Sequence, residues 1–291
     1  MLFLYKTPEK SGISCSNRKK TLSLRKKNNK PMKVITLDEL KSIQLDLLRK
    51  TAEFCENNGI RYFLCGGTLL GAIRHQGYIP WDDDIDISMP RPDYDRFIAL
   101  FNKSGNYYQV IDMSNNPKYG FPFAKVHDTR TIVDELQYAK DQFGVYIDIF
   151  PIDGVGEDKQ VFRILRWRKI LHTKKANYYQ RTIPKKIINT FGKILLLPFS
   201  VHQILKKMDK EARKYPYGST SRAGIIINPY GTREIVNLTV FDRPIPMKFE
   251  DREYMVPADY DTWLRSIYGD YMQLPPEDKR HSPHVSVAYW K

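Results

Sequence analysis

Carboxylates are densely spaced in one short run of the sequence, at Asp82, Asp83, Asp84 and Asp86. Isoleucines occupy positions 85 and 87. If residues 83–88 form a β-strand, alternate side chains point to opposite faces, so both isoleucines enter the core while Asp84 and Asp86 share the other face. Two strand positions span about 6.6 Å, from which carboxylates can converge on one or two hard cations. Asp82 can extend this row, whereas Asp83 has the opposite parity.

Metal binding is the interpretation that this run favours. Carboxylates crowded on one face repel one another, and burying them unpaired is costly. Mg²⁺ or Mn²⁺, together with the phosphates of a substrate, would relieve that repulsion. The alternative is an exposed acidic turn, which the two isoleucines disfavour because they place the run at the edge of the core.

A third carboxylate with similar surroundings is Asp148, which lies between Ile147 and Ile149. A neighbouring strand would aim this side chain at the same metal face. The alternative is an aspartate at a strand end whose oxygens accept backbone N–H groups. Asp153 precedes Gly154 and is predicted to be a turn residue.

Upstream of the acidic run, Gly66-Gly67-Thr68 is predicted to join a strand to a helix. Glycines let the backbone approach a ligand closely, and the N–H groups at a helix N-terminus suit a phosphate. Arg74 and His75 lie between this junction and the acidic run, and can add donors to a substrate phosphate. The alternative is that both are ordinary surface cations.

The elements that must position these residues alternate between helix and strand. Apolar periodicity predicts a helix over residues 38–57, capped by Asp38, and further helices over residues 68–75 and 93–102. Short apolar runs bounded by turn residues predict strands over residues 61–65, 83–88, 107–113, 121–126, 131–135 and 145–150. This order predicts an α+β fold, a mixed sheet flanked by helices.

The net charge of +14 is unevenly divided. Residues 1–33 carry +9 and are predicted to be a flexible arm, residues 157–222 carry +13 and are predicted to be a basic helical insertion, and the remainder carries −8. We therefore expect a catalytic core over residues 34–156, to which residues 223–291 return. Basic patches favour polyanionic partners, such as nucleic acid, an anionic membrane or a phosphorylated substrate.

The apolar segment at residues 187–205 is flanked by lysine pairs. It predicts either a helical subdomain packed on the sheet or an element lying on an anionic membrane surface. No run of eighteen apolar residues predicts a transmembrane helix. The N-terminus lacks a secretory pattern, and the three cysteines make neither a metal pair nor an even disulfide set. A cytoplasmic location is therefore expected.

The run GGTLLGAIRHQGYIPWDDDIDI at residues 66–87, with MPRPDYDRF at 89–97, closely resembles the LicD family. Further matching segments are FAKVHDT at 123–129, YIDIFPIDG at 146–154, YGDYM at 268–272 and LPPEDKR at 274–280. The resemblance covers residues 38–155 well and residues 250–291 more loosely. Fukutin-type enzymes, which transfer ribitol phosphate, look related through the same acidic strand.

The resemblance implies a nucleotidyltransferase-like fold and a CDP-alcohol phosphotransferase activity. In such a reaction a phospho-alcohol, typically phosphocholine, moves from a CDP-activated donor to a hydroxyl of a cell-surface glycan or its lipid-linked precursor, and CMP is released. The implied metal ligands are Asp84, Asp86, Asp148 and Asp82. The residues implied to bind the donor are Gly66, Gly67, Thr68, Arg74 and Lys125.

Asp148 is also placed to deprotonate the acceptor hydroxyl. Thr68 stands where the fold usually has Gly-Ser, and Asp128 is a further candidate beside Lys125. Family members often carry Arg at the position of His127, and adjacent histidines at the position of Pro283-His284, so the resemblance implies no direct role for either segment.

Three alternative functions are open. The same site could transfer phosphoethanolamine, glycerol phosphate or ribitol phosphate. An Asp-x-Asp pair also holds a metal on the diphosphate of a sugar nucleotide in glycosyltransferases, but the long LicD-like run disfavours that class. A nucleic-acid-binding protein with an inactive transferase domain would explain the basic segments, but the chain retains every carboxylate of the proposed metal site.

Overall fold

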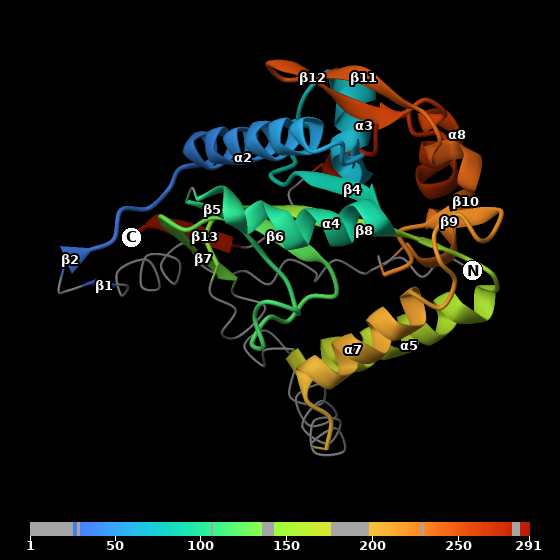
Figure 1. The fold of residues 1–291 in the computed structure, drawn as a ribbon. Coiled ribbons are helices and arrows are strands. Elements are labelled where there is room, and N and C mark those ends of the chain that lie inside the picture. The colour runs from blue at the N-terminus through green and yellow to red at the C-terminus, as the bar shows by residue number, and fades with distance from the viewer. Residues whose placement is uncertain are drawn as a thin grey trace.

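A seven-stranded mixed sheet forms the centre of the molecule in the computed structural model (Figure 1). The structure describes residues 26–27, 30–105, 107–135, 143–175, 198–227, 230–280 and 286–291. The predictions for residues 1–25, for the greater part of the apolar segment at 187–205 and for Pro283-His284 lie outside these ranges. The mixture of helices and sheet confirms the predicted α+β class.

Two parallel strands occupy the middle of this sheet, β4 (Asp86–Pro90) and β8 (Tyr146–Gly154). The short strand β3 (Phe63–Leu64) pairs with the other edge of β4. The free edge of β8 is shared. Its first half pairs with β6 (Ala124–Asp128), which β5 (Tyr108–Ile111) extends. Its end pairs with β9 (Arg222–Gly224), which β10 (Val236–Asn237) extends.

Three helices contact the first half of the sheet: α2 (Leu37–Asn57), α3 (Gly66–His75) and α4 (Arg91–Phe101). Apolar residues of α2 and α4 form one core with the inward residues of the strands, which include Ile85, Ile87, Ile147 and Ile149. The predicted inward direction of these isoleucines is therefore confirmed, whereas Asp84 lies before β4 and has no strand parity. Burial of one face fixes the register, because a shift by one residue would bring the carboxylates into the core.

In the part of the basic region that the structure describes, two helices lie side by side, α5 (Asp158–Lys175) and α7 (Val201–Ala212). Figure 1 shows them on the side of the sheet opposite to α2. Strands β9 and β10, which follow these helices, pair with the central sheet. The division of the chain into residues 157–222 and 223–291 stays a prediction. No helix within the described residues is long and apolar enough to cross a membrane.

The C-terminal part adds a hairpin, β11 (Pro244–Phe249) and β12 (Arg252–Pro257), and helix α8 (Tyr260–Tyr268). The hairpin contacts α3 and β3. A separate pair of strands, β7 (Thr131–Glu135) and β13 (Ser286–Trp290), joins the last residues of the chain to the middle. Short 3₁₀ turns are Asn102–Ser104, Gly231–Glu234, Leu238–Phe241 and Glu277–Lys279, and β1 (Lys26–Lys27) pairs with β2 (Lys30–Pro31).

Several predicted boundaries were wrong, each for a local reason. The cap of α2 is Thr36 rather than Asp38, because Thr36 and Glu39 form a reciprocal capping box. Helix α3 begins at Gly66, so the two glycines form its first turn instead of a preceding loop. Asp153 lies inside β8 and is buried, whereas the sequence predicted a turn there.

Strand β4 begins at Asp86, three residues later than predicted. The buried Gln44 side chain of α2 explains the difference. Its Nε2 donates to the carbonyl oxygens of Asp83 and Tyr146, at 3.0 and 3.3 Å. An amide from a helix thus satisfies these two carbonyls, and the β4–β8 ladder begins only beyond them, at the pair Asp86 and Asp148.

Candidate active site

Three charged side chains form a row across adjacent strands of the sheet. Asp86 on β4 is the direct register partner of Asp148 on β8, and Asp148 is the register partner of Lys125 on β6. Residues directly opposite in neighbouring strands point to the same face. The structure therefore brings together three residues that are far apart in the sequence and that the sequence assigned to one site.

Lys125 and Asp148 form an ion pair in which the Lys125 Nζ donates to Asp148 Oδ1 at 2.5 Å. The lysine side chain is only 2% exposed and the aspartate side chain 16%. Burial on both sides weakens solvent screening, so this pair is electrostatically strong. It fixes a positive charge beside the carboxylate row.

Asp84 and Asp82 precede β4 and lie next to the same row. Asp84 lines a small hollow together with Leu40, Gln44, Asp83 and Tyr146 and two valines, Val133 and Val145. The Asp82 side chain accepts the N–H of Asp83 at 3.3 Å. Because these residues lie before the ladder, Asp84 reaches the site from a bend in the chain.

The first turn of α3 packs directly against two of these carboxylates. Asp86 Oδ2 lies 3.0 Å, and Asp82 Oδ2 2.7 Å, from where a Cβ would stand on Gly66 and Gly67 respectively. Gly66 has φ +55°, a conformation that favours glycine. The Thr68 hydroxyl accepts the Asp86 N–H at 2.8 Å. The turn thus holds aspartates at the positive end of a helix, which stabilises their charge.

This arrangement revises the expected geometry of Gly66-Gly67-Thr68. The sequence predicted a turn that faces a phosphate directly. In the structure the two glycines face the carboxylates of the site, and the threonine hydroxyl positions the Asp86 backbone. A role of these residues in binding the donor stays a prediction.

Electrostatic crowding is greatest at Asp86. Burial raises the pKa of its carboxyl well above the ordinary value, and the neighbouring charges of Asp84, Asp148 and Asp82 raise it further. The Lys125 charge acts in the opposite direction. A bound cation would relieve this repulsion.

The four carboxylates fit a hard divalent cation by their chemistry, since oxygen donors are the ligands that Mg²⁺ and Mn²⁺ prefer. Across the described ranges, no group of three or more His, Cys, Asp or Glu side chains is arranged to hold an ion. Mg²⁺ is usually bound by one or two carboxylates together with water and substrate phosphates. The residues fit that pattern rather than a complete protein cage.

Arg74 lies at the end of α3 and joins the C-terminal segment. Its guanidinium donates to the Tyr271 carbonyl at 2.8 Å and to His75 Nε2 at 3.0 Å. Burial lowers the pKa of both Arg74 and His75. These contacts connect the helix to residues 260–280, and a contact of Arg74 with a donor phosphate stays a prediction.

Three residues near the row were missed or discounted by sequence reasoning. The His127 Nδ1 accepts the Gly144 N–H at 3.0 Å, and burial lowers the pKa of His127 to about 4. Tyr230 and Tyr268 contact each other edge to face, and the nearby charge of Asp86 adds to the effect of burial in raising the pKa of both phenols. The signal available for Tyr268 was its place in the motif YGDYM.

Asp128, the further candidate, has a structural partner. It is fully buried, and its oxygens accept the Arg130 guanidinium at 2.6 to 3.2 Å. It lies at the end of β6, three positions from Lys125 and with the opposite parity. The side chain therefore stabilises the turn into β7 and does not join the row of Asp86, Asp148 and Lys125.

Known proteins similar to this chain were found in two comparisons. Residues 59–202 match the family model described as "LicD/FKTN/FKRP, nucleotidyltransferase domain". The Haemophilus influenzae protein named lipopolysaccharide cholinephosphotransferase LicD is 33% identical over 89% of this chain and 99% of its own length. The mouse and human ribitol 5-phosphate transferases FKRP are 49% identical over 49 residues, which is 16% of this chain and 10% of theirs.

Proposed function

Because the chain belongs to the LicD family, we propose that it is a metal-dependent transferase of a phospho-alcohol. The donor is a CDP-activated alcohol, with CDP-choline as the leading candidate. The acceptor is a hydroxyl of a cell-surface glycan such as lipopolysaccharide, or of its lipid-linked precursor. The observation that carries this proposal is the row of Asp86, Asp148 and Lys125 across three strands, with Asp84 and Asp82 beside it.

A nucleotidyltransferase-like arrangement of the sheet accompanies this proposal. It is supported by the description of the matching family model, and by a helix N-terminus that meets a carboxylate strand at the centre of a mixed sheet. Asp84 and Asp86, with Asp148 or Asp82, would hold Mg²⁺ or Mn²⁺. A bound divalent cation would supply positive charge to the phosphate oxygens of the donor.

The residues of the chain have distinct tasks in this reaction. The Asp148 carboxylate accepts the proton of the acceptor hydroxyl as its oxygen forms a bond to the β-phosphorus. The bond from that phosphorus to the oxygen bridging to CMP breaks, and CMP leaves. Lys125 donates to a phosphate oxygen and so stabilises the charge that develops there. Asp148 and Lys125 are adjacent, which allows proton acceptance and charge stabilisation at one phosphorus.

Ribitol phosphate is the second candidate for the transferred group, since the FKRP proteins that match in part are named ribitol 5-phosphate transferases. The two candidates differ in charge, because choline is a cation and ribitol is neutral. Incubating the protein with Mg²⁺ and a panel of CDP-alcohols, and measuring CMP release, distinguishes them. Release of a nucleoside diphosphate from a sugar nucleotide instead would contradict the proposal.

Substitution within the acidic run tests the metal site. We expect Asp84→Asn and Asp86→Asn each to lower CMP release at least a hundredfold, because each removes a charge that holds the cation. Asp83→Asn is the matched control, since the carboxylates that raise the pKa of Asp86 are Asp84, Asp148 and Asp82, and the Asp83 carbonyl is the group that Gln44 binds. All three proteins should keep their folded circular-dichroism spectrum. An active Asp84→Asn/Asp86→Asn double variant would overturn the assignment.

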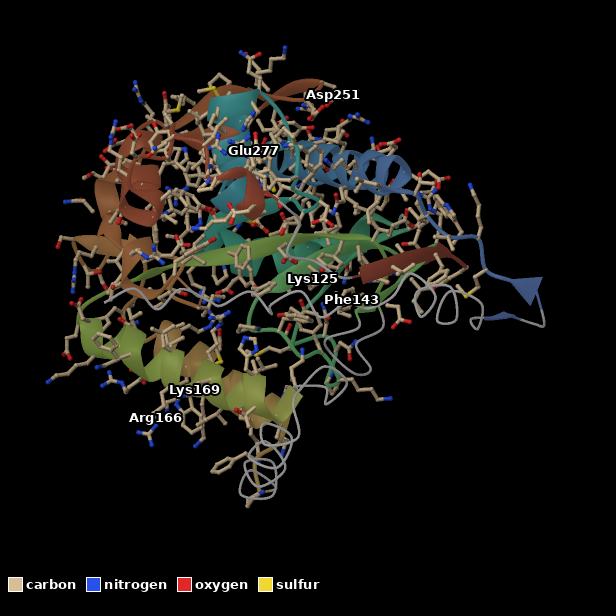
Figure 2. The ribbon with its side chains drawn as sticks, turned by 180° about the vertical axis from the view of Figure 1, so that it is seen from behind. Lys125, Phe143, Arg166, Lys169, Asp251 and Glu277 are labelled. Carbon is tan, nitrogen blue, oxygen red and sulfur yellow. The ribbon has the colours of Figure 1, made fainter. Side chains whose placement is uncertain are left out.

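The second part of the proposal is that the protein is cytoplasmic and contacts an anionic membrane surface. An exposed stripe runs along α5 at helical spacing, formed by Lys159, Phe162, Arg166 and Lys169. Phe162 is 60% exposed. Figure 2 shows Arg166 and Lys169 on the side of α5 that faces away from the sheet. Cations around an exposed aromatic ring suit the headgroup region of an anionic bilayer.

A further inference from the structure

Four aromatic rings surround the ammonium group of Lys125. Its Nζ lies 3.5 Å from the ring centre of Tyr146, 4.6 Å from that of Phe121, and 5.3 Å from those of Phe123 and Phe143. We call these four rings the aromatic box. Figure 2 shows Lys125 and Phe143 close together at the central sheet. Such enclosure by ring faces is the arrangement that recognises quaternary ammonium groups.

The rings of the box interact with the charge of the resident lysine but do not meet its hydrogen-bonding capacity. A primary ammonium has three N–H donors. The acceptor that the described residues offer it is Asp148 Oδ1, and the four rings lie within 5.3 Å of the Nζ of this 1% exposed residue. Ring faces attract the charge but replace hydration incompletely, and a buried polar group without acceptors is costly. A quaternary ammonium has no N–H donors and would not incur this cost.

The position of the box relative to the carboxylates identifies its ligand class. Tyr146 lies on β8 two residues before Asp148, so both side chains point to the same face of the sheet. Tyr146 also lines the hollow that contains Asp84. A cation in the box is therefore next to the site where the donor phosphates would be held. In phosphocholine only two carbons separate the ammonium from the phosphate oxygen. A site for the ammonium must therefore lie close to the site for the phosphates, as the box does.

We propose that the aromatic box binds the cationic headgroup of the donor alcohol, a choline-like quaternary ammonium, and that the Lys125 ammonium occupies this position until the donor binds. The inference rests on the proposed function and specifies the substrate class of the same site. On binding, one positive charge replaces another beside Asp148, so the electrostatic balance of the buried site is kept. The displaced Lys125 becomes available to the donor phosphates.

Neutral alcohols such as glycerol or ribitol gain no cation–π attraction in the box. The box therefore predicts discrimination between donors of different charge, and its rings act as specificity residues. A second cation, Lys175 of α5, lies over the Phe121 ring at 3.8 Å and donates to the Gly120 carbonyl. Phe121 is shared between two cations, which makes Phe143 and Tyr146 the better positions for a test.

Donor discrimination is measured as the ratio of kcat/KM for CDP-choline to that for CDP-glycerol. We expect Phe143→Leu and Tyr146→Leu each to lower this ratio about tenfold, while Tyr146→Phe, which keeps the ring, preserves it. Phe101→Leu in the α4 cluster is the control for loss of a buried ring away from the site. If the leucine variants reduce turnover of both donors equally, the box serves only to position Lys125 and the proposal is overturned.

Binding of tetramethylammonium tests the box without turnover. We expect the Lys125→Ala variant to bind this ion, measured by calorimetry or NMR titration, about tenfold more tightly than the wild-type protein, because the resident cation is gone. Adding Phe143→Leu should abolish the gain. This result in a protein that releases no CMP from any donor would support the box while rejecting the proposed function. No binding to Lys125→Ala would overturn the box, even in an enzyme that turns over CDP-alcohols.

Discussion

At the scale of single residues, the site depends on side chains held by backbone contacts. Asp82 and Asp86 lie against the first turn of α3 because Gly66 and Gly67 have no Cβ, and the Asp86 backbone is fixed by the Thr68 hydroxyl. These contacts hold carboxylates close together that would otherwise separate by repulsion. The arrangement of these carboxylates therefore depends on the missing Cβ atoms of both glycines as well as on the charged groups themselves.

Gly67→Ala should separate activity from stability. A Cβ at this position would lie 2.7 Å from Asp82 Oδ2, so the carboxylate must move. Alanine favours helix over glycine by about 1 kcal/mol, which offsets the displacement of a side-chain end. We expect an unfolding free energy within about 1 kcal/mol of wild type, and CMP release at least tenfold lower.

Gly105→Ala is the control for that substitution. Gly105 has φ +72° with nothing within 4 Å of its Cβ position, so alanine there should destabilise through backbone strain and leave CMP release unchanged. Full activity of Gly67→Ala would remove Asp82 from the proposed metal site.

His127 gives the protein a predictable pH dependence of stability. Burial lowers its pKa from 6.5 to about 4, so the unfolded chain binds more protons between these values, and the stabilisation present above pH 6.5 is lost as the pH falls towards 4. Between pH 7 and pH 5 this loss amounts to about 2 kcal/mol. His127→Asn keeps an acceptor for the Gly144 N–H and cannot titrate.

The loss between pH 7 and pH 5 is measured by urea unfolding of both proteins. The variant should lose about 2 kcal/mol less than wild type. Equal losses would mean that His127 is not the group responsible.

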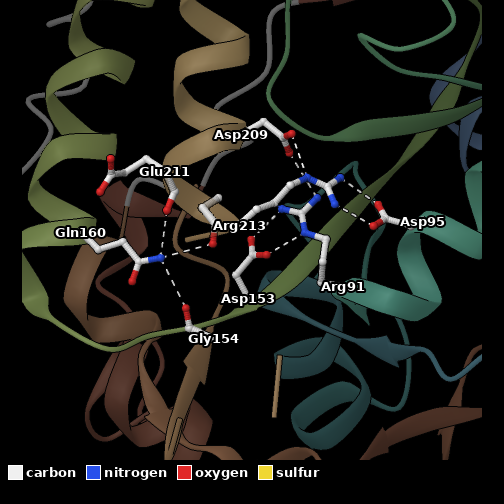
Figure 3. A network of polar contacts seen from close by, with 9 residues as sticks. Arg91, Asp95, Asp153, Gly154, Gln160, Asp209, Glu211 and Arg213 are labelled. Carbon is white, nitrogen blue, oxygen red and sulfur yellow. Dashed lines mark hydrogen bonds and ion pairs between the residues drawn. The ribbon is translucent and has the colours of Figure 1, made fainter. Parts of the chain in front are cut away.

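At the scale of elements, a buried polar network attaches the basic helices to the sheet (Figure 3). The Arg91 guanidinium at the start of α4 binds Asp153 of β8 through two hydrogen bonds, at 2.6 and 2.7 Å, and reaches Asp209 of α7. Gln160 of α5 donates to carbonyl groups of Gly154, Glu211 and Ala212. The helices are thus fixed relative to the strand that carries Asp148.

Asp153→Asn should destabilise the protein strongly, because it leaves the buried Arg91 charge without its bidentate partner. Removing one member of a buried ion pair costs about 3 kcal/mol or more. Asp95→Asn is the matched control within the same network. Asp95 binds Arg213 in an exposed pair, with side chains 43% and 40% exposed, and its loss should cost less than about 1 kcal/mol.

Chemical unfolding of both variants provides the measurement. Equal destabilisation by the two substitutions would show that burial does not determine the strength of this network.

At the scale of the whole molecule, charge is divided between an acidic body and basic additions. Residues 157–222 carry +13, whereas residues 34–156 and 223–291 together carry −8. The carboxylate row lies in the acidic body, and the exposed stripe of α5 lies on the side opposite to α2. The stripe on α5 can therefore approach an anionic surface while the sheet keeps the carboxylates of the proposed metal site.

Binding to anionic vesicles tests this separation. Arg166→Glu/Lys169→Glu should reduce co-sedimentation with phosphatidylglycerol vesicles at least fivefold at low salt, because polybasic contacts contribute about 1 kcal/mol per cation. Lys118→Glu/Lys248→Glu makes the same charge change at exposed positions elsewhere and should have little effect. Binding of wild type that does not weaken with salt, or equal effects of the two double variants, would contradict contact through α5.

The sequence by itself determined which side chains share a face. Alternation of isoleucine with aspartate places Asp86 and Asp148 away from the core, and this pattern depends only on the two-residue period of a strand. It also determined the α+β class, and the long motif at residues 66–87 indicated the family. These features are local, so they can be read along the chain.

Only the tertiary structure decided which distant segments meet. The parallel pairing of β4 with β8, the Gln44 amide that delays the start of β4, and the Arg91–Asp153 pair join residues 39 to 102 positions apart. The aromatic box likewise combines two segments around one lysine. Such contacts depend on packing of the whole core, which local periodicity does not specify, and this is why the acidic strand was predictable while the contacts of Gln44 and Arg91 were not.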